Sequence, residues 1–512
     1  MMSRRDVLAA GAAAVAAAGV AGEGVAKAAS RPAPHPTGSS PLDTHDALGL
    51  AQLVRTRQVS ATELLDAAIA RAEALNPQFN FMAQKHYDRA RAAIAAGLPE
   101  GPFTGVPWLL KDLNTYIAGE VTGNGSRFFN GNRATVTSEL VKRHERAGFV
   151  VFGKTTSPEL GLTGTTENRT TGQTRNPWNP QHTTGGSSGG AAAAVAAGVI
   201  PAAHATDGGG SIRIPASCCG LFGMKPSRGR IPMGPPRTEG WGGLSVHHAV
   251  THTVRDSAAI MDATWGVEPG SRYGAPSPEG TFLSHVDKAP KRLRVALMTT
   301  PMFGAPVDPQ VLAATRDAAH LLESLGHHVE EAAPKLDAGI MGWASFVLMA
   351  SAVAADMNDR AKATGIPVGP DVLEPITLAM IAFGEKASGM DYARANAALQ
   401  AGAIAMGQFM EGYDVILSPT LAAPPLELGR ISLSPDVGFE EWGKRAAMWS
   451  PFTQVANMTG QPAISMPLGM SAEGLPIGVM AMGRYGEEAL LFSLAGQVEK
   501  AAPWIGRRPP LA

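Results

Sequence analysis

Residues 183–190 read TTGGSSGG, and the run AAAAVAAG follows directly at residues 191–198. Two serines, Ser187 and Ser188, therefore lie between two glycine pairs, immediately before an alanine-rich helix. The stretch 185–189 matches G-x-S-x-G, the pattern that places a nucleophilic serine on a sharp turn in α/β-hydrolases. Such an enzyme also needs a histidine base and an acid later in the chain, and no histidine here lies in a suitable context. We therefore expect a different role for Ser187.

A second glycine run, DGGGSIR at residues 207–213, follows an expected strand. Glycines allow the backbone to turn sharply and to point successive N–H groups into one concavity. Such a concavity stabilises a developing oxyanion, and Ser211 at its end is placed to attack the carbonyl held there. The alternative is a structural turn in which Asp207 pairs with Arg213. The two interpretations are compatible.

The order of apolar and polar residues predicts alternating strands and helices. The expected elements are a helical region over residues 44–96, a strand over 105–113, a helix over 138–146, a strand over 149–152, a helix over 190–197 and a strand over 199–205. Residues 308–413 are expected to form a mostly helical insertion before a strand at 415–417. Regular alternation of this kind favours an α/β fold with a covered sheet.

Composition limits the function classes. The chain has 512 residues, 45% of them hydrophobic, and a formal net charge of −1. It lacks the basic surplus that a nucleic-acid ligand requires. The only cysteines, Cys218 and Cys219, are adjacent, which excludes an ordinary disulfide framework and a cysteine-type zinc cluster. His248 and His252 have i, i+4 spacing but no evident third ligand, so we expect no metal and no cofactor.

The N-terminus has the pattern of an export signal. Arg4 and Arg5 precede an Ala/Gly/Val run that ends near Gly22, and Ala26-Lys27-Ala28 has the small-x-small form of a cleavage site. We expect a twin-arginine signal peptide over residues 1–29, a linker over 30–42 and an exported protein, periplasmic or secreted. No other stretch is expected to span a bilayer, so no stable membrane anchor is predicted.

Three segments, taken together and in their order along the chain, change the interpretation of the glycine runs. They are GVPWLLKDL at residues 105–113, which contains Lys111, GGSSGG at 185–190 and DGGGSIRIP at 207–215. With RNPWNP at 175–180, GLFGMKPSRGR at 220–230 and GQPAISMP at 460–467, they resemble the amidase signature family over roughly residues 43–509. The resemblance implies one amidase domain over residues 43–512. It also implies a large mixed sheet with helices on both faces.

The resemblance also implies a role for each residue. Lys111 is the base, Ser187 is a bridging serine preceded by a cis peptide bond, and Ser211 is the nucleophile. Backbone N–H groups of Gly208, Gly209 and Gly210 form the oxyanion hole. Ser188, Asp207 and Arg213 support the geometry by hydrogen bonding. The implied activity is hydrolysis of a non-peptide carboxylic amide through a serine acyl-enzyme, without metal or organic cofactor.

Within the family, RNPWNP, SIRIPASCCG at residues 211–220 and APWIGRRP at 502–509 are most similar to bacterial amidases of the 6-aminohexanoate-cyclic-dimer hydrolase type. The expected partners are a small amide substrate and water, and a homodimer is compatible with the sequence. Three alternatives stay open: the glutaminase subunit of a tRNA-dependent amidotransferase, an aryl acylamidase or carbamate hydrolase, and a catalytically silent binding protein, against which the three intact reacting side chains argue. Met341, Met349, Met380 and Met390 lie in variable regions expected to line the substrate pocket, although each one singly is more typical of a helical core.

Overall fold

The computed structural model describes residues 40–302 and 304–511. The expected signal peptide, residues 1–29, and most of the expected linker therefore lie outside the described residues. The end of that linker is already helical, because Ser40 caps the short helix α2 (Pro41–Thr44). Its hydroxyl accepts the N–H of Leu42, and the side chain of Asp43 accepts the N–H of Ser40.

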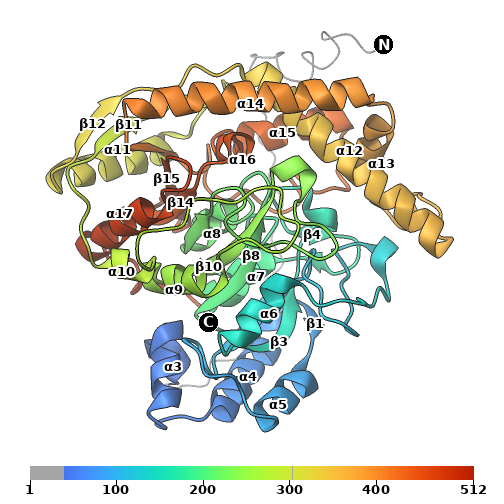
Figure 1. The fold of residues 1–512 in the computed structure, drawn as a ribbon, viewed down its shortest axis with the longest axis vertical. Coiled ribbons are helices and arrows are strands. Elements are labelled where there is room, and N and C mark those ends of the chain that lie inside the picture. Colours follow the sequence, from blue (N-terminus) through green and yellow to red (C-terminus); the bar gives the residue numbers. More distant parts are fainter. Residues whose placement is uncertain (1–39, 303, 512) are drawn as a thin grey trace, which may run out of the picture.

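A large mixed sheet forms the centre of the molecule (Figure 1). Its eight strands lie in the order β12-β11-β13-β15-β14-β9-β10-β8. In chain order they are β8 (Ala202–Asp207), β9 (Phe222–Lys225), β10 (Val246–Thr251), β11 (Arg294–Leu297), β12 (His328–Glu331), β13 (Val415–Pro419), β14 (Ala463–Met470) and β15 (Pro476–Gly483). The pairs β11–β12 and β11–β13 are parallel, whereas the other pairs are antiparallel.

The central strands of this sheet are buried on both faces, which explains their nearly continuous apolar sequences, whereas the edge strand β12 is mostly exposed. Val295 and Leu417 point into one core, whereas Ala296 and Ile416 point into another. The first core is closed by α9 (Val254–Thr264), α10 (Leu283–Val286), α11 (Pro309–Ser324) and α17 (Glu488–Ala501). The second is closed by α14 (Gly389–Glu411) and α16 (Gln454–Thr459). The predicted α/β architecture with helices on both faces is confirmed.

A three-stranded sheet, ordered β1-β3-β2, lies beside the β8 end of the large sheet. Its strands are β1 (Met82–Lys85), β2 (Pro107–Lys111) and β3 (Val150–Thr155). The surrounding helices are α3 (Ala47–Arg55), α4 (Ala61–Phe79), α5 (Tyr87–Ala95), α6 (Glu139–Arg146) and α7 (Gly189–Ala196). Helix α8 (Arg213–Cys219) packs instead on β9, β14 and β15 of the large sheet. The predicted helical region over 44–96 is thus interrupted by β1, whose four residues were too short a signal to predict.

The strand predicted over 199–205 begins later, at Ala202. Gly198 ends α7 in the left-handed conformation, at φ +74°, and the N–H of Val199 still bonds to the carbonyl of Ala194. This cap uses the first residues of the predicted strand. The predicted strands over 105–113 and 149–152 correspond to β2 and β3.

The insertion over 308–413 is mostly helical, as predicted, but also contains β12. Besides α11 and α14 it comprises α12 (Ala338–Thr364) and α13 (Pro375–Gly384). The sequence analysis predicted no further stretch long and apolar enough to span a membrane, and α12 contradicts that prediction in length and composition. Its most apolar 18 residues have a mean hydropathy of 1.7, and 39% of them are buried. Its buried residues pack along α13 and α14 on one side of the molecule (Figure 1), which accounts for the apolar sequence.

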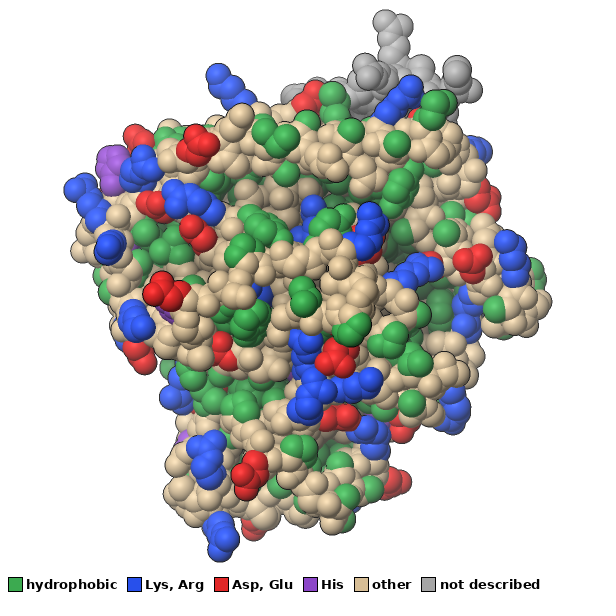
Figure 2. Space-filling model, in the orientation of Figure 1, with side chains coloured by type: hydrophobic (Ala, Val, Ile, Leu, Met, Phe, Trp, Pro, Cys, Tyr) green, Lys and Arg blue, Asp and Glu red, His purple; other side chains and the backbone are tan. Residues whose placement is uncertain are grey.

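Lys, Arg, Asp and Glu side chains are mixed over the face shown in Figure 2. Ion pairs among the described residues include Arg272 with Glu239 and Arg484 with Asp414. Pairs of this kind at the surface contribute little to stability.

Candidate active site

Lys111 is the last residue of β2, and its side chain is completely buried. Its Nζ donates to Oγ of Ser187 at 2.7 Å and to Oγ1 of Thr206 at 2.8 Å. Burial lowers the pKa of Lys111 well below its ordinary value, and the negative charge of Asp207 opposes this only in part. Both partners are hydroxyls, which can donate as well as accept, so the site accommodates a neutral amine.

The loop before α7 holds Ser187 against this lysine. The peptide bond between Gly186 and Ser187 is cis, as the resemblance implies. Gly186 must be a glycine, because a Cβ would lie 2.3 Å from the carbonyl oxygen of Thr165. Oγ of Ser188 donates to the carbonyl of Thr206 at 3.1 Å and accepts its N–H at 3.2 Å. Ser188 therefore fastens the loop to β8.

Ser211 lies on the turn between β8 and α8, with 9% of its surface exposed against 2% for Ser187. The turn is tight, since Gly210 adopts φ +136°. The loop of Ser187 packs against the start of α8, where a Cβ on Gly185 would lie 3.0 Å from Cα of Pro215. Lys111 and Ser187 are therefore in direct contact, and the loop of Ser187 packs against the helix that begins just after Ser211. In the part of the chain that the structure describes, the hydroxyl groups of Ser187 and Ser211 form no hydrogen bond with each other.

The glycine run lies between two other segments of the chain. The ring of Trp241 occupies the space beside Gly208, where a Cβ would approach it to 2.6 Å. Oγ1 of Thr453 donates to the carbonyl of Gly209 at 2.7 Å. These contacts fix the backbone of the run and leave no space for a side chain at position 208.

Asp207 and Arg213 form a buried ion pair. Nε and Nη2 of Arg213 each donate to the carboxylate at 3.0 Å, and the carboxylate also accepts the N–H groups of Gly210 at 2.7 Å and Ile212 at 3.1 Å. Burial acts to raise the pKa of Asp207, but Arg213 outweighs it and lowers the pKa to about 2. The structural turn considered from the sequence is therefore present, and it shapes the loop that carries Ser211.

Two supporting residues were missed by the sequence analysis. Thr206 directly precedes Asp207, and the alternation along β8 could have placed it beside Lys111 only if the neighbouring strand were known. Asn457 bonds both to Asp207, at 2.9 Å, and to Nη2 of Arg213, at 2.7 Å. Its position on α16 is fixed by tertiary packing, for which the local sequence contains no signal.

Other residues considered from the sequence have structural partners. Nε2 of His248 bonds to Oγ of Ser257 at 2.9 Å, and Nε2 of His252 bonds to the carbonyl of Val195 at 2.9 Å. Met341 and Met380 are buried in the helical layer, with 2% and 1% exposure, whereas Met390 is 66% exposed. These methionines are therefore better explained as helix packing or surface than as a pocket lining.

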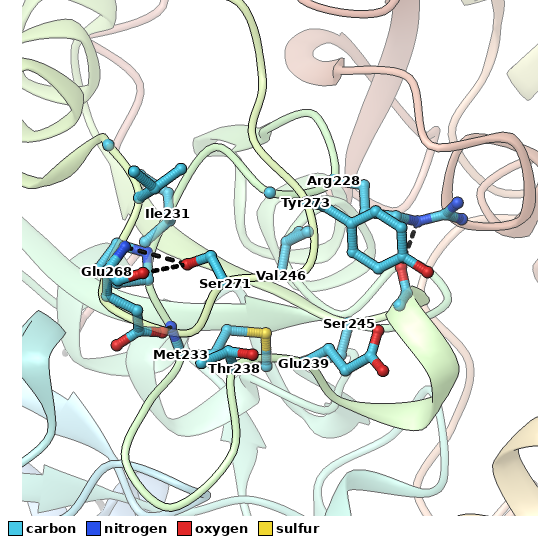
Figure 3. A pocket seen from close by; sticks show the side chains of 15 residues that line it. Arg228, Ile231, Met233, Thr238, Glu239, Ser245, Val246, Glu268, Ser271 and Tyr273 are labelled. Atoms are coloured by element: carbon cyan, nitrogen blue, oxygen red, sulfur yellow. Dashed lines mark hydrogen bonds between the residues drawn. The ribbon is translucent and has the colours of Figure 1, made fainter.

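A separate pocket lies between residues 228–246 and 266–273 (Figure 3). Ser271 bonds to the backbone of Glu268 there, and Oε1 of Glu268 accepts the N–H groups of Met233 and Gly234. Arg228 donates to the carbonyl of Gly243 at 2.6 Å. None of the predicted site residues lines this pocket, so it is distinct from the cluster around Lys111.

Comparison with known proteins finds the amidase family over residues 63–492. The chain is 38% identical over 483 residues to a 6-aminohexanoate-cyclic-dimer hydrolase of Paenarthrobacter ureafaciens, covering 91% of this chain and 96% of that protein. The solved structure of 6-aminohexanoate cyclic dimer hydrolase complexed with substrate superposes with a TM-score of 0.87 at 37% identity, over 92% of this chain and 100% of that one. A bacterial aryl acylamidase of the amidase signature family superposes with a TM-score of 0.81 at 28% identity, covering 91% of this chain and 100% of that one.

Proposed function

This chain belongs to the amidase signature family, and we propose that it hydrolyses small carboxylic amides through an acyl-enzyme formed on Ser211. One observation carries the proposal. A fully buried lysine without a carboxylate ligand lies 2.7 Å from Oγ of Ser187, on the loop that packs against the segment of Ser211. A desolvated amine is a competent base near neutral pH.

The proposed reaction has two halves. Neutral Lys111 takes the hydroxyl proton of Ser187 while Ser187 takes that of Ser211, whose Oγ bonds to the amide carbon. The tetrahedral intermediate collapses by cleavage of the C–N bond, and the proton passes back through Ser187 to the leaving amine. Water then attacks the acyl-enzyme by the same proton route and releases a free acid. The link between the two serines forms when substrate is bound, as is common for catalytic hydrogen bonds.

The oxyanion is held by backbone N–H groups of the glycine run. Gly210 contributes differently from its neighbours, because its N–H already donates to Asp207 at 2.7 Å. The N–H groups of Gly208, Gly209 and Ser211 are then the main donors, and Gly210 keeps the turn in shape. Asp207, Arg213 and Ser188 act by holding this loop and that of Ser187.

Similarity to 6-aminohexanoate-cyclic-dimer hydrolases supports the proposed substrate class. Trp241 lies against Gly208, and Trp449 lies 3.4 Å from the position of a Cβ on Gly164. We propose linear or cyclic amides of amino-alkanoic type. Assays of the cyclic dimer of 6-aminohexanoate, a linear amide, an anilide, a carbamate, an ester and glutamine test this choice.

The nucleophile is tested by active-site labelling with a fluorophosphonate. We expect one adduct, on Ser211, and none in Ser211→Ala. Ser187→Ala keeps the labelled site but reacts slowly. Ser188→Ala loosens the same loop without removing a proton carrier, so we expect a smaller loss of rate than in Ser187→Ala. An adduct on Ser187 in the wild type would restore the hydrolase-elbow interpretation.

Export is a separate part of the proposal and rests on Arg4, Arg5 and Ala26-Lys27-Ala28. An exported enzyme acts with water as acyl acceptor, away from charged tRNA. Cell fractionation of the wild type and of Arg4→Lys/Arg5→Lys tests it. Retention of the wild type in the cytoplasm, with activity only in the presence of glutamine and partner subunits, would favour an amidotransferase subunit.

A further inference from the structure

β2 is an edge strand of its sheet, so one side of its backbone lacks a strand partner. The N–H of Asp112 donates to the carbonyl of Thr155 on β3. The backbone N–H and carbonyl of the preceding residue, Lys111, therefore point to the side of β2 that has no strand partner. The carbonyl of Lys111 accepts the hydroxyl of Thr115. Its N–H donates to Nδ1 of His204 at 3.1 Å. The imidazole of His204 thus accepts the backbone hydrogen bond that a neighbouring strand would otherwise accept from Lys111.

Two side chains on the same face of β8 form hydrogen bonds with Lys111. His204 and Thr206 are two residues apart on this strand, so their side chains point to the same side. His204 accepts the backbone N–H of Lys111, while Thr206 binds its Nζ at 2.8 Å. His204 therefore holds the backbone of Lys111 in place, and Thr206 holds its terminal amine.

These bonds determine the tautomers of two histidines. Since Nδ1 of His204 accepts from Lys111, its proton must lie on Nε2. Nε2 of His204 lies 3.0 Å from Nδ1 of His247, on the adjacent strand β10, so His247 accepts and also carries its proton on Nε2. Both rings are buried and stacked, with centroids 5.2 Å apart. Protonation of His204 at Nδ1 would place one N–H against another.

Among the described residues, the charged and titratable groups that act on His204 include no carboxylate, although Glu488 acts on His248 and Asp207 acts on Lys111. The groups that face His204 are His247 and His248 of β10, His144 of α6 and Lys111 of β2. Burial lowers the pKa of His247, His248 and His144 to about 3, and it lowers that of His204 well below its ordinary value. The ring of His144 lies 5.8 Å from that of His204. All four imidazoles are therefore uncharged at neutral pH.

We propose that His204, held in one tautomer by His247, is a positioning residue for the base: it anchors the backbone of Lys111 without placing a positive charge beside the amine. This inference rests on the proposed function of Lys111. A leucine or a protonated histidine at position 204 does not provide both properties. An asparagine provides an acceptor near the place of Nδ1.

The test compares variants of two buried histidines that are neighbours on β8 and β10. In His204→Leu we expect kcat/KM at pH 7 to fall about tenfold, the loss typical of one hydrogen bond, since the lysine is less well held. The acid limb of the pH–rate profile moves up by about one pH unit as water reaches the amine. His204→Asn recovers most of both effects.

His248→Leu is the matched control, because His248 is equally buried on β10 but bonds to Ser257 of α9. We expect it to lower thermal stability without moving the acid limb. Equal shifts in His204→Leu and His248→Leu, or no shift in either, would overturn the inference. Rates are normalised to the fraction of protein that a fluorophosphonate labels, so that misfolded protein does not contribute.

Nitrogen-15 spectra of histidine-labelled wild-type protein test the tautomers without any substitution. We expect His204 and His247 as Nε2–H tautomers that do not titrate between pH 5 and 8. An Nδ1–H signal for His204, or its titration in this range, would contradict the proposal. Activity that survives Lys111→Met would instead contradict the proposed function, and the two failures are therefore distinguishable.

Discussion

Two buried lysines on adjacent strands show how surroundings decide what a lysine can do. Lys111 on β2 and Lys154 on β3 have no exposed surface, and Lys154 is in register with Leu110, the residue before Lys111. Nζ of Lys154 donates to the carbonyls of Thr115 and Val121 at 2.9 Å and to Oγ1 of Thr122 at 2.7 Å. It also lies 3.6 Å from the carboxylate of Asp112.

Three acceptors match the three protons of an ammonium group, so Lys154 is held as a cation. Burial lowers its pKa, but the charge of Asp112 acts against that effect. Lys111 has two hydroxyl partners and, among the described residues, forms no ion pair; Asp207 acts on it without direct contact, so Lys111 can lose its proton. The comparison shows that burial alone does not make a base. The chemistry of the surrounding acceptors decides.

The largest expected effect is on activity and comes from Lys111→Met. Removing one member of a coupled nucleophilic unit reduces kcat/KM on the order of 10⁴-fold. The stability is retained or improved, because an apolar side chain replaces a buried amine. The wild type is neutral at this position when folded and charged when unfolded, so its stability rises with pH between the lowered pKa and about 10.4. Denaturant titrations across pH should show this slope in the wild type and not in the variant.

Lys154→Met is expected to have the opposite signature. It leaves Asp112 buried without its cation, which costs about 3–5 kcal/mol of stability. Activity per folded molecule, counted by fluorophosphonate labelling, stays within about fivefold of the wild type because Lys154 binds neither serine. The double variant Lys154→Met/Asp112→Asn should recover part of the stability. A stable Lys154→Met that is as inactive as Lys111→Met would remove the distinction between the two lysines.

A smaller effect is expected from Thr206→Val, which removes one of two partners of Nζ of Lys111. The loss of one hydrogen bond corresponds to about a tenfold lower kcat/KM. Thr155→Val is the control, since this equally buried hydroxyl donates to the carbonyl of Leu110 at 3.3 Å and not to the amine. Both variants should lose about 1 kcal/mol of stability, but only Thr206→Val should lose activity. Identical kinetics for the two would show that Thr206 has no special role.

The sequence predicted the parts of this site that depend on local chemistry. Glycine runs that must turn, a lysine at the end of an apolar strand and serines beside the glycines were each visible, and their common order matched one family. The structure places Lys111 against Ser187 and shows the expected cis peptide bond before Ser187. Their catalytic roles remain a proposal, to be decided by the variants above.

Features that arise from distant contacts could not be predicted. The support of Asp207 by Asn457 joins residues 250 positions apart, and the anchoring of Lys111 by His204 joins residues 93 apart. The strand β1 was hidden between two helices because its four residues are ordered by pairing with β3. The apolar sequence of α12 is typical of both a membrane-spanning helix and a packed helix, and its contacts with α13 and α14 are visible only in the structure.

The central claim is that Lys111 acts as a neutral amine while Lys154 does not. The most direct test is the pH dependence of serine phosphonylation by a fluorophosphonate in the wild type, in Lys111→Met and in Lys154→Met. We predict that the wild-type rate rises with pH to a plateau, with an apparent pKa well below the ordinary lysine value of about 10.4. Lys154→Met should keep this profile and Lys111→Met should lose it. The same pH dependence in the wild type and in Lys111→Met would contradict the account.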